Sequence, residues 1–475
     1  MRESAWFAKP LLGLLLMAGL VWTGCAWGSE EPLDYGRFGK LTLYRNSPQP
    51  SHVVLFVSGD GGWNLGVIDM AQSLAGLDAL VVGIDITHYL RELGRSQEKC
   101  SYPAADFESL SKYVQKKLGF ERYRPPVLVG YSSGATLVYA LLAQAPPNTF
   151  RGAISMGFCP DLPLNKPFCG GQGLKSEPAP KGHGYNFLPT QGLQNPWIAF
   201  QGTIDQVCDA AAVDAYVKQV RNSEVVLLPK VGHGFSVQKN WLPQFREAFT
   251  RLVRDEAAAA VHGDVATGVG DLPLVEVAVQ DPANGLLAVI LTGDGGWASL
   301  DRDIGGVLAT KGVAVVGFNT LQYFWTAKSP DLAARDLERV IRHYLKSWQR
   351  QRVVLIGYSL GADVLPFMAG RLPEDLRQQV AAVALLGPGT TANFEFHLSD
   401  WLGGGTAGLP VAPELARMKD LKVLCLYGEE EQDSLCRALA PENSQVKKVV
   451  LGGGHHFGGD YVKLAELIFA EAEAR

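Results

Sequence analysis

The sequence predicts an α/β protein made of two tandem domains, each a mostly parallel sheet flanked by helices. A length of 475 residues is more than one hydrophobic core usually fills. In both halves, short runs rich in Val, Ile and Leu alternate with longer amphipathic segments, as parallel strands joined by helices do. Several motifs also recur in the same order in the two halves, which indicates a duplicated unit.

The repeat is clearest at two glycine-rich motifs. SGDGGW at 58–63 recurs as TGDGGW at 292–297, and GYSSGA at 130–135 recurs as GYSLGA at 357–362. We therefore expect an N-terminal domain over 30–254 and a C-terminal domain over 274–475. The segment 255–273 is rich in small residues without apolar periodicity, so we interpret it as the linker. The strands expected in pairs are 53–57 and 288–291, 80–84 and 313–317, 127–129 and 353–356, 153–156 and 383–386, 197–200 and 423–426, and 225–228 and 449–451.

Composition and charge exclude several classes of protein. With 47% hydrophobic and 19% charged residues, the chain can bury ordinary cores and is not disordered in bulk. The net charge is −5 without a block of Lys or Arg, so we expect neither nucleic-acid binding nor a polybasic membrane anchor.

The N-terminus predicts export. Arg2 and Lys9 precede an apolar run from Leu11 to Trp22 and a small-residue zone that ends at Gly28, the pattern of a cleaved signal peptide over 1–28. The run is short for a membrane-spanning helix. Lipidation at Cys25 is the alternative.

The remaining six cysteines divide evenly, four in the first half and two in the second. In an oxidising compartment this predicts disulfides within each domain, with Cys425 paired to Cys436. No CxxC motif or His-rich companion is present, so no metal site is expected.

The pentapeptide Gly-x-Ser-x-Gly follows an apolar strand and precedes a helix-forming stretch at both Ser132 and Ser359. This context is typical of the nucleophile elbow of the α/β-hydrolase fold, in which a tight strand-to-helix turn projects the serine above the sheet.

A serine hydroxyl needs a histidine to accept its proton and an acid to orient that histidine, and this fold supplies them in the order Ser, acid, His. In the first copy they are Ser132, Asp205 and His233. In the second copy we choose Ser359, Asp433 and His455.

The choices in the second copy follow from two spacings. Asp433 precedes Cys436 by three residues, as Asp205 precedes Cys208, although counting from the preceding glycine selects Glu431 instead. His455 precedes Phe457 by two residues, as His233 precedes Phe235, and His456 is the alternative.

The glycine-rich motif after an early strand is where this fold presents a backbone N–H to an oxyanion. We expect the amides of Asp294 and Leu360 to form the oxyanion hole of the second copy, with Asp60 and Ser133 as their equivalents. A phosphate-binding P-loop is a poor alternative because no Gly-Lys-Ser/Thr follows. Serine chemistry of this kind requires no cofactor.

The aromatic run Tyr323-Phe324-Trp325 follows a predicted strand. Aromatic residues most often belong to the core, but the carboxyl end of a strand in an α/β sheet is also where ligands bind. We therefore take these three residues as candidate substrate-binding residues, with Phe396 and Trp401 in the segment 394–402 as a further candidate apolar rim.

The second copy resembles the VirJ/AcvB family of bacterial virulence proteins. The resemblance rests on the segments LTGDGGW at 291–297, LQYFW at 321–325, GYSLGADVLP at 357–366, FEFH at 394–397, LYGEEE at 426–431 and GGHHF at 453–457. It implies a periplasmic hydrolase that releases the amino acid from aminoacyl-phosphatidylglycerol, lysyl- or alanyl-, at the membrane surface, with Ser359 and His455 in its site. It also implies a link to virulence and membrane lipid homeostasis, with type IV secretion components as candidate partners.

Two other functions compete with this one. The first is a general lipase or thioesterase, which would use the same serine chemistry on simple acyl esters. The second is a periplasmic binding or chaperone module of a secretion machine, in which the duplicated fold is retained without catalysis.

Overall fold

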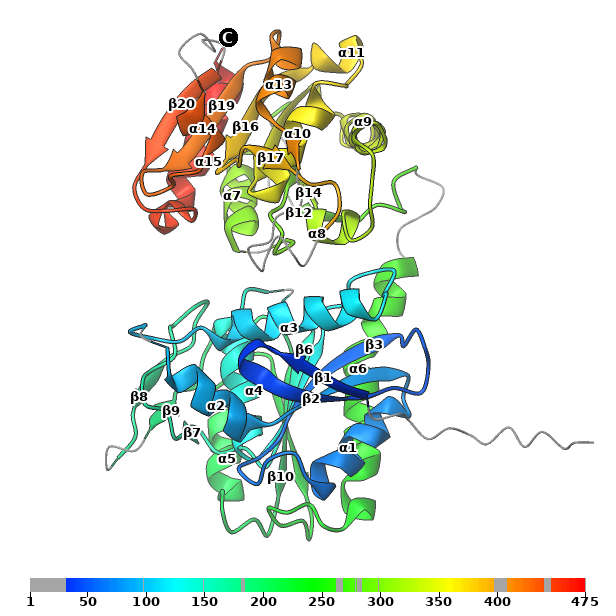
Figure 1. Cartoon of the computed structure of the whole chain (residues 1–475), viewed down its shortest axis with the longest axis vertical. Coiled ribbons are helices and arrows are strands. Elements are labelled where there is room, and N and C mark those ends of the chain that lie inside the picture. The colour runs from blue at the N-terminus through cyan, green and yellow to red at the C-terminus, as the bar shows by residue number, and fades with distance from the viewer. Residues whose placement is uncertain are drawn as a thin grey trace, which may run out of the picture.

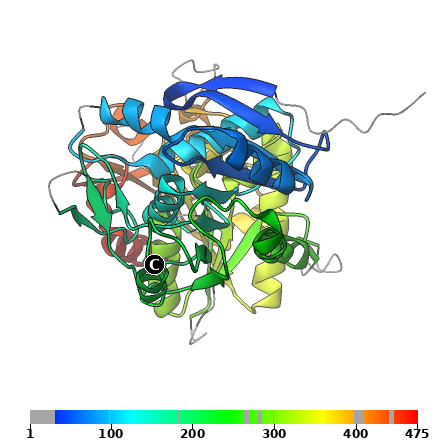
Figure 2. The same ribbon diagram turned by 90° about the horizontal axis from the view of Figure 1, so that it is seen from below.

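In the computed structural model the chain forms two sheets of mainly parallel strands, each covered by helices and stacked along the long axis of the molecule (Figure 1). Viewed along that axis, the N-terminal domain lies over the C-terminal one (Figure 2). The structure describes residues 31–474, except 97, 148, 181–183, 262–267, 278, 280–283, 298, 397–407 and 440–445. The predicted signal peptide and Trp401 lie outside the described residues.

The strands and helices of the N-terminal domain follow the alternation predicted for it. They are β1 Glu31–Tyr35, η1 Gly36–Phe38, β2 Gly39–Tyr44, β3 His52–Val57, α1 Leu65–Ala75, β4 Ala79–Ile84, α2 Ile86–Gly94, α3 Pro103–Lys117, β5 Val127–Tyr131, α4 Ser133–Gln144, β6 Gly152–Met156, β7 Asp161–Leu162, β8 Ser176–Pro178, β9 Tyr185–Phe187, β10 Trp197–Gly202, α5 Ala210–Val217, β11 Ser223–Leu228, η2 Gln238–Asn240 and α6 Leu242–Val261.

The C-terminal domain repeats this order with fewer strands at its start. Its elements are β12 Leu274–Val277, β13 Leu286–Leu291, α7 Ser299–Thr310, β14 Ala314–Phe318, α8 Thr320–Tyr323, α9 Pro330–Ser347, β15 Arg352–Tyr358, α10 Leu360–Ala369, α11 Glu374–Arg377, β16 Val380–Leu386, β17 Thr391–Ala392, β18 Leu409–Pro410, α13 Ala412–Leu415, η4 Ala416–Met418, β19 Val423–Gly428, α14 Leu435–Ala438, β20 Val446–Leu451, η5 Phe457–Gly459 and α15 Tyr461–Glu473.

Strand order confirms the predicted fold class. The first sheet runs β1-β2-β4-β3-β5-β6-β10-β11 and the second runs β12-β14-β13-β15-β16-β19-β20. In both, the antiparallel strands lie at one edge, and the strands that carry the motifs are parallel and central. Every strand predicted as a pair forms in both copies, and this strand order together with the nucleophile elbows is that of the α/β-hydrolase fold.

The central strands are apolar on both faces because helices cover both sides of each sheet. Residues of β13 and of β15 from Val353 on are buried, and they divide between two hydrophobic clusters, one on each face of the sheet. Helix α9 shows the matching helical pattern, with one buried stripe that includes Leu337, Val340 and Ile341. The alternation of apolar strands and amphipathic helices therefore gives the predicted layers.

The predicted linker is partly helical. Helix α6 continues to Val261, so the first residues of the segment 255–273 extend the last helix of the N-terminal domain. At the other end, Arg339 of α9 binds the carbonyl oxygen of Gly268 and the carboxylate of Asp271, which attaches this part of the segment to the C-terminal domain. Alanine-rich sequence favours helix, which explains the helical start of this segment.

All six cysteines outside the N-terminal segment form disulfides within a domain, as predicted. The pairs are Cys100–Cys169, Cys159–Cys208 and Cys425–Cys436. Such bonds are typical of proteins from oxidising compartments. Among the described residues, no helix is long and apolar enough to cross a membrane.

The glycine after each nucleophile is required by close backbone packing. A β-carbon at Gly361 would overlap the carbonyl oxygen of Leu291 in β13 and lie 2.6 Å from that of Thr292. We expect Gly361→Ala to destabilise the C-terminal domain by about 1–3 kcal/mol, because neither backbone can move aside cheaply. Gly306→Ala in α7, where an added β-carbon meets nothing within 4 Å, is the matched control and should stabilise the helix by about 0.5–1 kcal/mol. Thermal unfolding of the full chain checks both, and an equal effect of the two substitutions would contradict the packing argument.

Candidate active sites

Each candidate nucleophile lies in the same strained turn between a central strand and a helix. Ser132 has φ 55° and ψ −124°, and Ser359 has φ 51° and ψ −120°, a conformation that L-residues rarely adopt. The turn is held on the sheet because Ser132 N–H donates to the Met156 carbonyl and Ser359 N–H to the Leu386 carbonyl. Both serines therefore occupy the nucleophile elbow that the sequence predicts.

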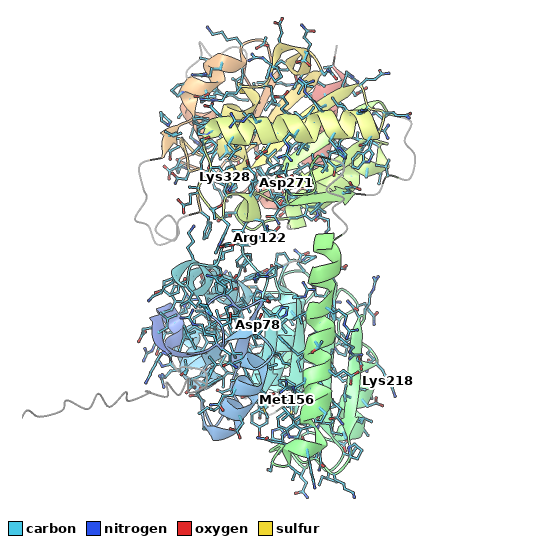
Figure 3. The ribbon with its side chains drawn as sticks, turned by 90° about the vertical axis from the view of Figure 1, so that its right-hand side faces the viewer. Asp78, Arg122, Met156, Lys218, Asp271 and Lys328 are labelled. Atoms are coloured by element: carbon cyan, nitrogen blue, oxygen red, sulfur yellow. A yellow bond between two sulfur atoms is a disulfide. The ribbon has the colours of Figure 1, made fainter. Side chains whose placement is uncertain are left out.

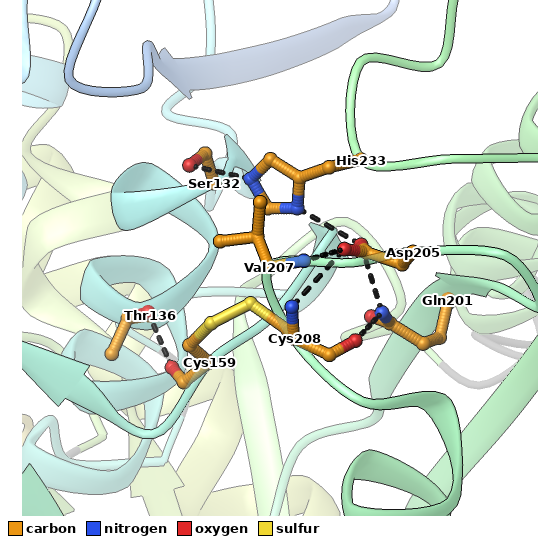
Figure 4. The surroundings of a disulfide bond; sticks show 8 residues. All are labelled: Ser132, Thr136, Cys159, Gln201, Asp205, Val207, Cys208 and His233. Carbon is orange, nitrogen blue, oxygen red and sulfur yellow. Dashed lines mark hydrogen bonds and ion pairs between the residues drawn. A yellow bond between two sulfur atoms is a disulfide. The ribbon is translucent and has the colours of Figure 1, made fainter.

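In the N-terminal domain the three predicted residues form a continuous hydrogen-bonded chain (Figure 4). His233 Nε2 lies 2.9 Å from Ser132 Oγ, and His233 Nδ1 lies 2.9 Å from Asp205 Oδ2. The side chain of Asp205 is fully buried and that of His233 is 17% exposed. This geometry can transfer a proton from the serine to the histidine while the carboxylate fixes the imidazole.

The environment of Asp205 keeps its carboxyl ionised. Burial opposes the charge, but hydrogen bonds from the backbone N–H of Cys208, from His233 and from the N–H of Val207 outweigh it and lower the pKa of Asp205. Gln201 Nε2 also donates to Asp205 Oδ2 at 3.0 Å. The carboxylate is thus preorganised to accept the Nδ1 proton of His233.

In the C-terminal domain the acid next to the histidine is Glu431. His455 Nδ1 lies 2.5 Å from Glu431 Oε1, and the second carboxylate oxygen accepts the N–H of Gly428 at 2.6 Å. In the described part of the chain no hydrogen bond joins Ser359 to His455, whose side chain is 41% exposed. Catalytic hydrogen bonds are often long or absent in sites without substrate, so this does not exclude His455 as the base.

The choice of Asp433 was wrong in its geometry, because this residue is exposed and the structure places Glu431 against His455. The end of the strand determines the position of the acid. Asp205 N–H donates to the Gly202 carbonyl and Glu431 N–H to the Gly428 carbonyl, so each acid closes the same four-residue turn at the end of its strand.

The cysteines used as a landmark for that choice are not equivalent. Cys208 is bonded to Cys159 after β6, whereas Cys436 is bonded to Cys425 within β19. The second copy has two more residues between acid and cysteine than the first. Counting from the glycine would therefore have identified Glu431.

The structure also separates the two neighbouring histidines. His455 faces Glu431, as expected from its spacing to Phe457, whereas the His456 ring lies 3.1 Å from the hydroxyl of Tyr358. The hydroxyl of Tyr131 in the first copy donates to the carbonyl of His233, and the hydroxyl of Tyr358 donates to that of His455. The tyrosine of each Gly-Tyr-Ser motif thus supports the histidine loop.

The glycine-rich loops lie beside the nucleophiles, where an oxyanion hole is expected. A β-carbon at Gly293 would lie 3.4 Å from Cβ of Ser359, and one at Gly59 would lie 2.9 Å from Cβ of Ser132. Leu360 is the first residue of α10 and Asp294 follows Gly293, so both predicted amides belong to backbone next to Ser359. Helix N-termini offer N–H groups without intrahelical partners, which suits this role.

The loop around Asp294 is anchored from below by a buried threonine pair. Thr320 Oγ1 donates to the carbonyl oxygens of Thr292 and Gly293, and Thr320 N–H donates to Thr292 Oγ1. In the first copy Ser58 Oγ accepts the Ile86 N–H in the corresponding place. The two loops therefore share the contact from a backbone N–H to a hydroxyl, and the second copy adds the hydrogen bonds of the Thr320 hydroxyl.

The three aromatic residues taken as candidates for substrate binding, Tyr323, Phe324 and Trp325, are buried by packing against other side chains. Phe324 is fully buried against Phe394, Tyr323 donates its hydroxyl to Asp336 at 2.6 Å, and Trp325 is 1% exposed. The indole of Trp325 stacks on Phe396, so this expected rim residue is also buried. The sequence left open whether these aromatic residues belong to the core or bind substrate. Phe324 belongs to the core of the C-terminal domain, whereas Trp325 packs against the N-terminal domain.

Sequence reasoning missed one pair of residues that shape both sites. Gly157 and Gly387 follow β6 and β16 with φ of 68° and 58°, and an added β-carbon would lie 3.1 Å from the ring of His233 or 2.8 Å from that of His455. The absence of a side chain thus leaves room for each imidazole. The signal was present, because both glycines follow matched strands of the repeat.

A polar cleft of about 1450 Å³ runs between the two domains. It is lined by Gly295 and Gly296 of the Asp294 loop and by charged residues of both domains, including Arg122, Asp271 and Lys328. Figure 3 shows these three charged side chains where the domains meet. The site at Ser359 therefore adjoins the domain interface.

Several solved structures overlap with about half of this chain. They include the esterase domain of a Rhodothermus marinus protein (14% identity, 47% of this chain and 97% of that one, TM-score 0.32), an α/β serine hydrolase without a lid from Xanthomonas campestris (21%, 48% and 94%, 0.31) and esterase 2 of Thermogutta terrifontis (19%, 48% and 95%, 0.34). Strand order and elbow geometry, rather than these partial overlaps, define the fold. None of the curated proteins matches the sequence significantly.

The family comparison matches residues 51–157 and 285–475 to bacterial virulence protein (VirJ). These segments include Ser132 of the first copy and Ser359, Glu431 and His455 of the second. They cover more than half of the chain, in agreement with the motifs that suggested the resemblance. The chain therefore belongs to the VirJ family of bacterial virulence proteins.

Proposed function

We propose that this protein is a periplasmic serine esterase that hydrolyses the aminoacyl ester of aminoacyl-phosphatidylglycerol at Ser359. The observation that carries the proposal is a nucleophile elbow at Ser359 together with a hydrogen-bonded pair of His455 and Glu431, all within the segment matched to the VirJ family. The disulfides and the N-terminal sequence pattern support a periplasmic location.

In this reaction Ser359 Oγ attacks the ester carbonyl carbon while His455 accepts the hydroxyl proton. The oxyanion accepts hydrogen bonds from the amides of Asp294 and Leu360. The bond to the glycerol oxygen then breaks, and His455 returns its proton to that oxygen, which releases phosphatidylglycerol. Water next attacks the aminoacyl-serine ester, gives its proton to His455, and the free amino acid leaves as Ser359 is reprotonated. Glu431 holds the imidazole throughout and stabilises its charged form.

Two carboxyl groups near Ser359 favour an aminoacyl substrate over a simple acyl ester. Asp363 lies one helical turn after Ser359, and its Oδ1 accepts the Gly389 N–H at 2.6 Å. Burial raises the pKa of Asp363 well above its usual range, and the charge of Asp294 adds to this effect. A substrate ammonium group beside these two acids would offset the effect of burial and favour the ionised form of Asp363. The first copy has Thr136 at this position, bonded to the Cys159 carbonyl.

The first copy is a second candidate site because its hydrogen-bonded triad is complete. Family membership favours Ser359, since the matched segments include all three residues of the second copy but only the serine of the first. We propose that Ser132 is a second nucleophile whose loss leaves the hydrolysis of aminoacyl-phosphatidylglycerol largely intact.

The first prediction about function concerns the two nucleophiles. Purified protein should release free amino acid from lysyl- or alanyl-phosphatidylglycerol in mixed micelles. Ser359→Ala should lower the rate by about 10³-fold or more, because the nucleophile is lost. Ser132→Ala is the matched control and should retain most of the rate. Equal release by wild type and Ser359→Ala would refute the assignment.

Two further outcomes would favour the competing functions. Faster cleavage of simple acyl esters than of aminoacylated lipid would favour a general lipase or thioesterase. Failure of a fluorophosphonate probe to label either serine in the folded protein would favour a binding or chaperone module, including one that serves type IV secretion.

The second prediction separates the two candidate acids. Glu431→Gln should slow fluorophosphonate labelling of Ser359 by about 10³-fold or more, because the amide no longer fixes the productive tautomer of His455. Asp433→Asn removes an exposed carboxylate and should leave the labelling rate unchanged. Mass spectrometry of the labelled peptides gives both rates. Slower labelling in Asp433→Asn than in Glu431→Gln would instead identify Asp433 as the acid.

The third prediction concerns substrate choice. Asp363→Thr, which introduces the residue of the first copy, should reduce hydrolysis of aminoacyl-phosphatidylglycerol about 10-fold or more while an uncharged acyl ester is cleaved at the wild-type rate. The physical reason is the loss of one charge-assisted contact to the ammonium group, worth about 1.5–3 kcal/mol. A parallel loss of both activities would indicate a structural role for Asp363.

A further inference from the structure

The two domains are stacked head to tail. On the N-terminal side, the cleft between them is lined by Arg151, Pro196 and Asn222, which immediately precede strands β6, β10 and β11. On the C-terminal side it is lined by Gly296 and Asn319, which follow β13 and β14. The amino edge of the first sheet thus faces the carboxyl edge of the second, which is the edge that carries Ser359.

Helix α3 of the N-terminal domain and the loop that follows it make direct contacts across this boundary. Lys116 Nζ donates to the Trp325 carbonyl at 2.7 Å and binds Glu395 at 2.9 Å. The indole N–H of Trp325 donates in return to the Phe120 carbonyl at 2.6 Å. A small buried cluster crosses the boundary at the same place, formed by Tyr123, Leu321, Trp325 and Phe396. This combination of apolar burial and charged hydrogen bonds attaches α3 to the second domain.

One turn earlier on α3, Lys112 reaches the loop of the candidate oxyanion hole. Its side chain is only 1% exposed, and its Nζ donates to the Asp294 carbonyl at 3.1 Å. Glu108, one further turn back, lies 3.0 Å from the same ammonium and balances its charge. Burying a lysine is costly unless it is paired and hydrogen-bonded. The contact is therefore a specific, buried interaction of the interface and not a chance contact of an exposed side chain.

We propose that the N-terminal domain is a positioning cap for the Ser359 site, with Lys112 as a positioning residue that fixes the Asp294 loop. The ammonium holds the peptide that follows Asp294, and the threonine pair beneath the loop holds the peptides before it. The amide of Asp294 is thereby clamped from both sides. The proposal rests on the proposed function only in taking this loop as the oxyanion hole.

Only the loop of the second copy receives such a contact from the other domain among the described residues. Counting from the first helical proline, Pro103 in α3 and Pro330 in α9, the residue equivalent to Lys112 is Arg339. Arg339 binds Asp271, Asp336 and Gly268, and none of these contacts leaves the second domain or its linker. The Ser132 site, at the opposite edge of the first sheet, provides an internal reference within the same molecule.

The test compares the two serines in one chain. We expect Lys112→Met in the full-length protein to slow fluorophosphonate labelling of Ser359 by about 10–100-fold, because a displaced oxyanion donor costs this much. Labelling of Ser132 should be unchanged. Lys112→Arg, which keeps a charged donor, should restore part of the rate. Lys218→Met, at an exposed lysine far from the interface (Figure 3), is the matched control and should change neither rate.

A second measurement does not depend on catalysis. Amide hydrogen exchange of the loop 292–297 should increase in Lys112→Met, while the equivalent loop 58–63 exchanges as in wild type. Unchanged exchange at 292–297, or an equal slowing of both serines, would overturn the positioning role. If wild-type Ser359 is not labelled, the proposed function fails, whereas the exchange result still decides whether Lys112 fixes the loop.

Discussion

The close approach of two backbones is the constraint on which both sites depend. Helix α10 begins so near β13 that a β-carbon at Gly361 would overlap the Leu291 carbonyl, and α4 packs in the same way with Gly134 on Val57. This approach forces the preceding serine into a left-handed conformation and brings the glycine-rich loop beside it. The nucleophile, the helix N-terminus and the loop amides are thus positioned by packing rather than by individual side-chain contacts.

This constraint explains which features could be predicted from the sequence. Glycines at the elbow and apolar strands before it are required by sterics, so Ser132, Ser359 and the paired strands could be located by pattern alone. His233 and Asp205 followed from their order along the chain. Each of these features is local, because its signal lies within a few residues of the group it positions.

The features that could not be predicted depend on contacts between distant segments. Asp433 was preferred because the cysteines seemed equivalent, but Cys208 and Cys436 have partners on different elements, so their spacing carried no information about the acid. The role of Trp325 depends on Phe120, which belongs to the other domain. No periodicity within one repeat can indicate a contact between the two repeats.

The duplication has therefore produced two sites with different surroundings. The first has a complete hydrogen-bonded triad in which His233 is mostly buried, and the second has a more exposed His455 at a boundary between domains. His455 is thus open to solvent at a site that adjoins the polar cleft, whereas His233 is largely enclosed by its own domain. Because the head-to-tail stacking places the amino edge of one copy against the reactive edge of the other, only one of the two sites can be contacted by the neighbouring domain in this way. The asymmetry between the copies thus follows from the geometry of a tandem repeat, because Lys112 reaches the loop of the other copy while its equivalent, Arg339, makes its contacts within its own domain and linker.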